Sequence, residues 1–417
     1  MTPEEQVQTL SRNTEDVLPH GALLERLEHS ARTGHPLRVK QGFDPTAPDI
    51  HLGHAVGLRK LREFQDLGHQ VVLIVGDYTA MVGDPSGRSK TRPRLSLSEV
   101  EAHATTYLDQ FFRVLDRNPD LPCHPVEIHR NGEWFSGMPF SEVLQLASQY
   151  TVSQLLERDD FSKRFSAEQP IGVHELLYPL MQGYDSVAVR ADIELGATEQ
   201  KFNLLVGREL QRLHHQPSQI VMTLPVLPGL DGVQRMSKSL GNYIGVTDSP
   251  EEMFGKIMSL PDTAMDAYWR LATGSTAEEL EGIRRDLSDG VNPILIKKRL
   301  GEQIVTIYYG ATAAVRARTD FETQFGRRQV PDNVDEFRGS EASGFLEKPS
   351  IVNFAMASGI CRSRGEVRRL LEAGAVEVDG VRIQGFEAEV DPSRGHILRI
   401  GRKMKKYIPG DTSNQVT

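Results

Sequence analysis

The sequence predicts an α/β fold in which a parallel sheet covered by helices is followed by a helical region and then by a small α+β unit. Three observations support this order. Residues 69–79, HQVVLIVGDYT, form a β-branched run typical of a strand that is buried on both faces of a parallel sheet. Strand-like and helix-like segments alternate up to about residue 232, whereas residues 250–325 show helical periods and almost no strands. Short strand-like segments return after residue 348.

The first elements form a strand–helix–strand unit. Residues 1–38 are expected to be largely helical, with Gly34 ending an apolar helical period. A short strand should then end near Gly42, followed by a proline-punctuated loop and a helix over about 51–67. The strand in 69–79 completes a βαβ unit, whose crevice lies at the carboxyl ends of its strands.

Further elements repeat the alternation. We expect helices over 95–120 and 140–158, on either side of a short Pro-rich insertion. A second series follows, with helices over 171–184 and 199–216 and strands at 187–196 and 220–226. The pattern of expected helices and strands changes along the chain and predicts four parts: a sheet domain over 1–232 with an insertion at about 117–165, a helical domain over 233–335, a linker at 336–347, and a small α+β unit over 348–410.

The composition is that of a soluble globular protein. The chain has 417 residues, of which 39% are hydrophobic and 25% are charged, so it is not globally disordered. The longest aliphatic run, Val71–Val75, is far shorter than the ~20 residues of a membrane helix. The acidic, polar start lacks the features of a signal peptide, and Cys123 and Cys361 have no metal-ligand spacing. We therefore expect reduced thiols, no metal site and a cytoplasmic location without membrane attachment.

The net charge of −9 is unevenly distributed. Residues 348–417 contain 12 Lys+Arg and 8 Asp+Glu, or +4, and the remainder contains 36 against 49, or −13. A basic tail on an acidic body favours an anionic partner for the tail, although solvated charged faces would give the same split.

Two short motifs carry residues suited to phosphate chemistry. His51 and His54 lie one turn apart at the start of the expected 51–67 helix, where free N–H groups and the helix dipole favour anions. Arg235 and Lys238, in the glycine-flanked run RMSKS, form a basic loop that could close over phosphates. Each motif alone is also compatible with an ordinary capping or surface role. The loop at 82–88 does not have the spacing of a P-loop.

Together the motifs resemble the signature of class I aminoacyl-tRNA synthetases, HIGH followed by KMSKS. GFDPTAPDIHLGH, GDPSG, YPLMQGYDS, an EQ pair and RMSKS occur in this order, and the series is similar to bacterial-type tyrosyl-tRNA synthetases over essentially the whole chain. SRGEVRRLLEAGAVEVDGVRI in the tail resembles an S4-type RNA-binding domain. The resemblance implies a Rossmann-like catalytic domain with an insertion, a helical domain that follows the RMSKS loop, and an S4-like RNA-binding domain.

The resemblance also implies roles for individual residues. The catalytic residues would be His51, His54, Arg235 and Lys238. ATP would be bound by Gly42, Asp44, Thr46, Gly53, Glu199 and Lys238. Tyrosine would be bound by Thr79, Asp84, Tyr178, Gln182, Asp185 and Gln200, of which Tyr178, Gln182 and Asp185 share one face of a helix by their spacing. RNA would be bound by Arg362, Arg364, Arg368 and Arg369.

Three positions depart from the family pattern. Relatives often have GGxDQ where this chain has GATEQ, so Glu199 is a longer carboxylate than the usual aspartate. Many relatives have a tyrosine at the position of Lys40, where it contacts the substrate hydroxyl, so Asp185 and a residue that the sequence does not identify are left for that contact. Arg235 replaces a lysine and keeps its charge.

The implied activity is that of a tyrosine–tRNA ligase. L-Tyrosine would be activated with ATP and its Mg²⁺ and then transferred to tRNA(Tyr), with no tightly bound cofactor, in a homodimer. The alternatives are a tryptophanyl-tRNA synthetase, an RNA-binding protein that has kept an inactive synthetase scaffold, and a nucleotidyltransferase of another kind. GDPSG, YPLMQGYDS and the S4-like tail argue against the first, the intact HLGH and RMSKS against the second, and the tail against the third.

Overall fold

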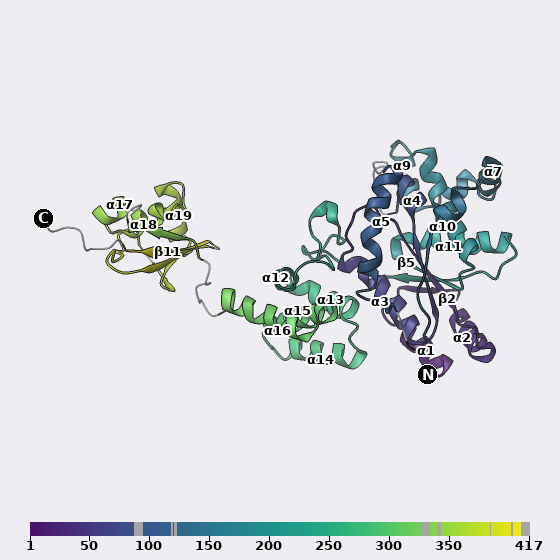
Figure 1. The fold of residues 1–417 in the computed structure, drawn as a ribbon, viewed down its shortest axis with the longest axis horizontal. Helices are drawn as coiled ribbons and strands as arrows, with labels where there is room; N and C mark the ends of the chain where they lie inside the picture. Colours follow the sequence, from purple (N-terminus) through teal and green to yellow (C-terminus); the bar gives the residue numbers. More distant parts are fainter. Residues whose placement is uncertain are drawn as a thin grey trace. The chain divides into compact units, whose positions relative to one another are not determined.

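The computed structural model of the protein describes residues 1–86, 95–117, 120, 123–326, 334–339, 343–383, 385–401 and 403–409. The chain divides into two compact units, Met1–Arg318 and Thr319–Thr417 (Figure 1). Within the described residues, none of the helices combines the length and the apolar character needed to cross a membrane. Gly87, the last residue of GDPSG, lies outside the described residues.

A six-stranded sheet forms the centre of the first unit. Its strands are β1 (Asp16–Leu18), β2 (Arg38–Phe43), β3 (Gln70–Val75), β4 (Glu127–Arg130), β5 (Ile193–Ala197) and β6 (Ile220–Leu224). They are arranged in the order β1-β6-β5-β2-β3-β4, with β1 antiparallel to β6 and all the other neighbours parallel. The continuous apolar runs of β3 and β6 are buried almost throughout, as expected for a sheet covered on both faces.

Helices surround this sheet and continue beyond it. The first are α1 (Pro3–Leu10), α2 (Ala22–Thr33), α3 (Leu52–Asp66), α4 (Asp77–Val82), α5 (Leu97–Phe111), α6 (Gly132–Phe135), α7 (Phe140–Ala147), α8 (Val152–Leu155), α9 (Asp159–Ser166), α10 (Val173–Val189) and α11 (Lys201–Leu213). The helical region comprises α12 (Pro250–Met258), α13 (Met265–Ala272), α14 (Ala277–Ser288), α15 (Pro293–Tyr309) and α16 (Ala311–Phe321). Short turns add η1 (Thr198–Gln200), η2 (Lys238–Leu240), η3 (Asp262–Ala264) and η4 (Glu322–Gly326).

The strand order reverses between β2 and β5. The crossover β2–α3–β3 leads toward one edge of the sheet and β5–α11–β6 toward the other. Because such crossovers are right-handed, α3 and α11 cover opposite faces, with the strands between them (Figure 1). A sheet of this kind opens a crevice at the carboxyl ends of the two strands where the order reverses. The sheet therefore predicts a ligand site between the ends of β2 and β5.

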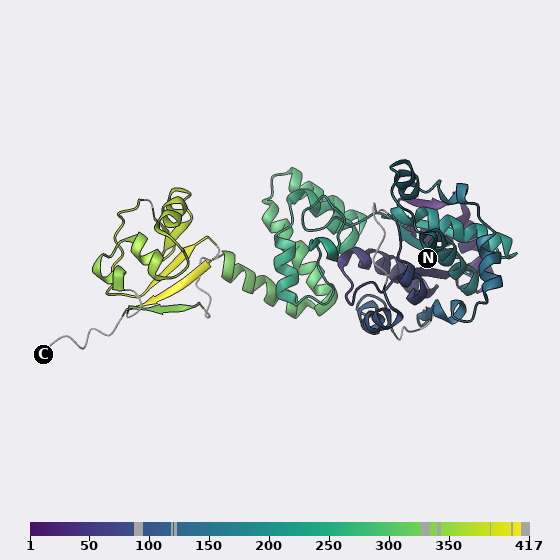
Figure 2. The ribbon, with the colours of Figure 1, turned by 90° about the horizontal axis from the view of Figure 1, so that it is seen from above.

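The second unit is a five-stranded sheet with helices on one face (Figure 2). Its elements are β7 (Glu336–Arg338), α17 (Ser343–Glu347), α18 (Ile351–Ala357), α19 (Arg364–Glu372), β8 (Val376–Val378), β9 (Val381–Arg382), β10 (His396–Ile400) and β11 (Lys403–Ile408). The strands follow the order β7-β11-β10-β8-β9. Phe337, Phe345, Phe354 and Tyr407 pack against one another in its core.

The structure corrects the predicted linker at 336–347. Residues 336–338 form β7, which pairs in parallel with β11, and Phe337 and Phe345 are buried in the core of the second unit. This segment is polar apart from isolated aromatic residues, so its sequence alone does not show that it belongs to a core. The described part of the segment is therefore structural, and the other predicted domain boundaries remain predictions.

Several predicted elements were also misplaced. Residues 127–130, predicted as part of the insertion, form the edge strand β4, and β1 was not predicted because three residues carry no clear period. Residues 77–82 form α4 rather than an extension of the preceding strand. Residues 187–189 end α10 rather than begin β5. The expected helix over 140–158 is divided into α7 and α8.

Candidate active site

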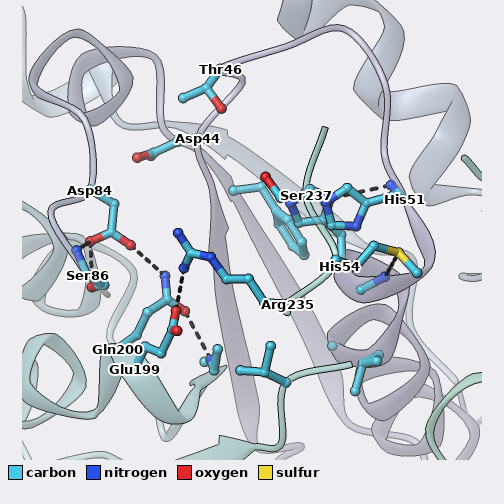
Figure 3. A pocket seen from close by; sticks show the side chains of 18 of the residues that line it. Asp44, Thr46, His51, His54, Asp84, Ser86, Glu199, Gln200, Arg235 and Ser237 are labelled. Atoms are coloured by element: carbon cyan, nitrogen blue, oxygen red, sulfur yellow. Dashed lines mark hydrogen bonds and ion pairs between the residues drawn. The ribbon is translucent and has the colours of Figure 1, made fainter. Parts of the chain in front are cut away.

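A cavity of about 490 Å³ lies at the carboxyl ends of β2 and β5 (Figure 3). It is bordered by the loop after β2, the start of α3, the turn after β5 and the loop that carries Arg235. The predicted residues that it brings together are Gly42, Asp44, Thr46, His51, Gly53, His54, Asp84, Tyr178, Glu199, Gln200, Arg235 and Lys238. Residues from five distant parts of the sequence therefore meet at the position that the sheet topology predicts.

The two histidines are stacked at the beginning of α3. Their ring centroids lie 3.8 Å apart with an interplanar angle of 18°. Burial, followed by the nearby His54 and Lys238, lowers the pKa of His51 to about 2, so its ring is neutral at pH 7. A Cβ atom on Gly53 would lie 3.0 Å from Nδ1 and Cε1 of His51, which explains the glycine between the histidines. His51 Nδ1 is buried without a hydrogen-bond partner among the described residues.

The loop that carries the RMSKS motif is docked against α3. The sulfur of Met236 accepts a hydrogen bond from Gly53 N at 3.3 Å, and Lys238 Nζ donates to the backbone oxygen of Asp49. Burial lowers the pKa of Lys238, while Asp49 opposes this shift. Asn242 accepts a hydrogen bond from Ser237 N at 2.8 Å and so fixes the far end of the loop. Ser239 is part of η2, and its side chain is outside the described set.

Arg235 reaches across the cavity to Glu199. The guanidinium Nη1 donates to Oε2 of Glu199 at 2.6 Å, and about a third of each side chain is exposed (Figure 3). The two departures from the family pattern at these positions thus contact each other. The pair joins the RMSKS loop to the turn that follows β5.

A smaller cavity adjoins the first and extends beneath it. Its lining includes Thr79, Tyr178, Gln182, Asp185 and Gln200, which are all the predicted tyrosine-binding residues except Asp84. Tyr178, Gln182 and Asp185 are presented by α10, as their spacing predicts. Asp84 borders the larger cavity and accepts a hydrogen bond from Gln200 Nε2 at 3.1 Å, so it lies beside the same group.

Asp44 links the two cavities. It accepts hydrogen bonds from the hydroxyls of Thr79, at 2.7 Å, and Tyr178, at 2.8 Å. Gly76 leaves room for this contact, because a Cβ atom there would collide with the side chains of Thr79 and Asp44. The carboxylate predicted to face a nucleotide is thus hydrogen-bonded to two residues predicted to bind an amino acid.

Asp185 borders the smaller cavity. Its two oxygens accept hydrogen bonds from Trp134 Nε1 at 3.0 Å and from Asn131 Nδ2 at 3.4 Å. Complete burial raises its pKa to about 7, although the charge of Lys40 and the two hydrogen bonds act in the opposite direction. The sequence analysis missed Trp134 and Asn131. The available signal was the position of NGEW directly after β4, because the carboxyl ends of parallel strands share one edge of the sheet.

Lys40 does not replace the tyrosine found in many relatives. Its Nζ donates to Glu194 Oε1 at 2.9 Å, to Ser186 Oγ at 2.8 Å and to the backbone oxygen of Gln182 at 3.0 Å. These acceptors use all three donors of an ammonium group. The side chain is completely buried, borders neither cavity and joins β2 to β5 and α10.

The four predicted RNA-binding arginines lie in the second unit, on or just before α19. All four are exposed, whereas Val367 and Leu371 on the same helix are buried in the core. Arg368 lies over the ring of Phe386, with its Cζ 5.6 Å from the ring centroid. This surface is a candidate site for the phosphates of a nucleic acid.

No group of three or more His, Cys, Asp or Glu side chains with an arrangement able to hold a metal ion occurs in the part of the chain that the structure describes. The acidic residues at the cavity instead pair with amides, hydroxyls and cations.

Comparison with known proteins identifies similar sequences and folds. Residues 32–326 match a family model described as class I tRNA synthetases (W and Y). The tyrosine–tRNA ligase of Moorella thermoacetica is 47% identical over 399 residues, covering 95% of this chain and 94% of that protein. That of Thermotoga maritima is 46% identical over 414 residues, covering 99% of each.

Solved structures show the same fold at lower identity. A C-terminally truncated mitochondrial tyrosyl-tRNA synthetase from Aspergillus nidulans has a TM-score of 0.63 and 20% identity, with 78% of this chain and 94% of that chain covered. The tyrosyl-tRNA synthetase of Archaeoglobus fulgidus, complexed with L-tyrosine, has a TM-score of 0.60 and 23% identity, with 76% and 99% covered.

The raised pKa of Asp185 predicts a pH-dependent effect of Asp185→Asn on stability. A carboxyl with a pKa of about 7 when folded and about 3.9 when unfolded makes folding less favourable as the pH rises from about 4 to 7. The asparagine variant has no carboxyl at this position, so its free energy of unfolding does not fall for this reason as the pH rises. Its free energy of unfolding relative to the unsubstituted protein should therefore increase by about 2–3 kcal/mol between pH 5 and pH 8.

Urea unfolding of the first unit at the two pH values measures this difference. Asp109→Asn, at a side chain that is 86% exposed, is the matched control and should show no such change. A pH-independent effect of Asp185→Asn would contradict the raised pKa.

Proposed function

The chain belongs to the class I tRNA synthetases of the tryptophan and tyrosine group, and we propose that it joins L-tyrosine to tRNA(Tyr) in two steps. In the first, a carboxylate oxygen of tyrosine attacks the α-phosphorus of ATP, and pyrophosphate leaves. In the second, a hydroxyl of the terminal ribose of the tRNA attacks the carbonyl carbon of tyrosyl-adenylate, and AMP leaves. The observation that carries the proposal is the cavity of His51, His54, Arg235 and Lys238, joined to a pocket that Asp185 borders.

The first step requires charge stabilisation rather than a general base. The attacking carboxylate is ionised at pH 7 because its pKa lies well below this value. Two anions must be brought together, and negative charge increases at the phosphorus. Lys238 and Arg235 supply positive charge from the loop, and the stacked His51 and His54 supply hydrogen bonds from α3. We propose that Mg²⁺ enters bound to the phosphates of ATP, as part of the substrate.

The remaining residues of the larger cavity are assigned to the nucleotide. Gly42, Asp44, Thr46 and Gly53 border the space between β2 and α3, where the adenosine would lie, and Glu199 would receive a ribose hydroxyl. Glu199 Oε2 is bonded to Arg235, but a carboxylate offers about four lone-pair sites. The longer side chain can therefore bind both groups.

The smaller cavity is assigned to the amino acid. Thr79, Asp84, Tyr178, Gln182 and Gln200 would surround its ammonium and carboxylate groups, and Asp185 would receive its phenol hydroxyl. Tryptophan is the competing substrate within the family. Tyrosine is favoured because the relatives that match nearly the whole chain are named tyrosine–tRNA ligases, and Asp185, held by Trp134 and Asn131, can accept a hydrogen bond from a phenol hydroxyl.

The second unit is proposed to bind the tRNA. Its exposed arginines are Arg362, Arg364, Arg368 and Arg369, while Val367 and Leu371 of the same helix are buried in the core of the unit. The positive charges are therefore accessible to a partner. Arginine is suited to RNA because its guanidinium forms paired hydrogen bonds with phosphate oxygens.

We further propose a homodimer. Large apolar side chains are exposed over α7 to the start of α10, among them Phe140, Phe165 and Val173 at 74%, 65% and 77% exposure. Exposed apolar surface of this kind is typical of an interface. Light scattering should give about twice the 46.6 kDa of one chain, and a monomer would contradict the proposal.

A cytoplasmic location is proposed from the two free cysteines, Cys123 and Cys361.

ATP–pyrophosphate exchange with each of the 20 amino acids tests the activity. Tyrosine should support exchange and phenylalanine and tryptophan should not.

His54→Ala and Lys238→Ala should each lower the tyrosine-dependent rate by about 10²–10³ with little change in tyrosine affinity, because one group that stabilises the transition state is lost. Exchange with tryptophan, or with no amino acid, would overturn the proposal, and weaker tyrosine binding at an unchanged rate would overturn the role of the two residues.

Removal of residues 327–417 should separate the two steps. The remaining chain keeps both cavities and the whole segment that matches the family model, so exchange should survive. Aminoacylation of tRNA(Tyr) should fail or weaken strongly, because the exposed arginines are removed. Full charging by the truncated protein would contradict the RNA-binding role of the second unit, whereas loss of exchange would mean that this unit is needed by the catalytic fold.

A further inference from the structure

Arg158 is a buried arginine between α8 and α9, in the segment that separates the two halves of the sheet. Its side chain is only 3% exposed. The guanidinium donates to Asp160 Oδ1 at 2.7 Å through Nε, to Asn203 Oδ1 at 2.9 Å through Nη1, and to Ser86 Oγ at 2.7 Å through Nη2. It does not border either cavity. Any influence on a ligand must therefore pass through the groups that it contacts.

One branch of these contacts leads to Asp84. Ser86 accepts a hydrogen bond from Arg158, so its hydroxyl hydrogen is directed to Asp84 Oδ1 at 2.6 Å. Ser86 N donates to the same oxygen at 2.9 Å, and Arg158 Nη2 lies 3.6 Å from it. Gln200 donates to the other oxygen. Every one of these groups is a donor, so the branch directs hydrogen bonds at both oxygens of Asp84.

The second branch leads to Gln182. A guanidinium can only donate, so Asn203 must present its oxygen to Arg158 and its NH₂ group to the opposite side. Asn203 Nδ2 indeed donates to Gln182 Oε1 at 2.9 Å. Gln182 is thereby oriented with Nε2 toward Glu194 Oε1 at 3.1 Å. One arginine thus determines the direction of the hydrogen bonds on both sides of the amino-acid pocket.

We propose that Arg158 is a positioning residue for the ammonium group of the amino-acid substrate, acting through Ser86 on Asp84 and through Asn203 on Gln182. The proposal rests on the assignment of the smaller cavity to tyrosine. Charge supports it, because Arg158 is shared between Asp84 and Asp160. Two carboxylates and one guanidinium leave one negative charge, which the incoming ammonium balances. Arg158 lies in the same segment as the apolar surface proposed for dimer contacts, and its two branches of hydrogen bonds connect that segment to Asp84 and Gln182.

The test compares two ligands that differ only in the ammonium group. Dissociation constants are measured by calorimetry for L-tyrosine and for 3-(4-hydroxyphenyl)propanoate. The constant of the propanoate divided by that of L-tyrosine is the ratio that reports the contribution of the ammonium site. Arg158→Met should reduce this ratio by roughly tenfold or more, because a charge-assisted hydrogen bond contributes about 1.5–3 kcal/mol and 1.4 kcal/mol corresponds to tenfold. Arg158→Lys should retain part of the ratio, and the KM for ATP should not change.

Arg164→Met is the matched control. Arg164 is equally buried in the same segment and pairs with Glu175 at 2.7 Å, with both side chains 3% exposed. Its replacement should lower stability but leave the ratio unchanged. An equal loss of the ratio in Arg164→Met would overturn the proposal, since the effect would then be general.

Two milder variants cover the case in which Arg158→Met does not fold. Asn203→Leu is close in volume and adds no charge, but it can neither accept from Arg158 nor donate to Gln182, and Ser86→Ala interrupts the other branch. Each should lower the ratio. An unchanged ratio in both variants would overturn the proposal, while a failure of the unsubstituted protein to bind L-tyrosine would instead contradict the proposed function.

Discussion

The ion pair between Lys40 and Glu194 joins three of the elements that line the smaller cavity, the proposed amino-acid pocket. Lys40 belongs to β2 and Glu194 to β5, the two strands between which the strand order reverses, and both side chains contact Ser186 of α10. Removing one partner of a buried pair typically costs about 3–5 kcal/mol, because the other charge remains buried without compensation. The position of α10, and with it Tyr178, Gln182 and Asp185, therefore depends on a contact that no substrate touches.

The charges around the pocket follow from this pair. Lys40 lowers the pKa of Asp185 and partly offsets the effect of burial, whereas Glu194 raises it. Gln182 is held between Glu194 and Asn203, so the same ion pair also borders the network that reaches Arg158. If the smaller cavity binds tyrosine as proposed, Asp185 would meet its hydroxyl with a nearly balanced charge, and Asp84 and Asp160 would leave an excess of negative charge near its ammonium group.

The sequence predicts the features that are local or marked by motifs. The apolar run of β3, the helix that begins at His51 and the common face of Tyr178, Gln182 and Asp185 follow from periodicity and spacing. Features that depend on distant pairing were missed. Phe337 lies in a polar segment, and its burial requires β7 to pair with a strand 70 residues later. Trp134 follows a four-residue edge strand that has little signal of its own. Lys40 shows the same limit, since only the structure reveals that its three donors face Glu194, Ser186 and Gln182.

The two substitutions in the family motifs are explained by one contact. Considered separately, Glu199 for aspartate and Arg235 for lysine lengthen two side chains on different loops. The structure brings them together at 2.6 Å across the cavity, where the reach of each compensates for the distance to the other. Because the pair is partly exposed, its contribution to stability is small, about 1 kcal/mol or less. The RMSKS loop is instead held mainly by Met236 on Gly53 and by Lys238 on Asp49. The pair between Arg235 and Glu199 therefore adds little to the stability of the loop, which Met236 and Lys238 join to the start of α3 and to the loop before it.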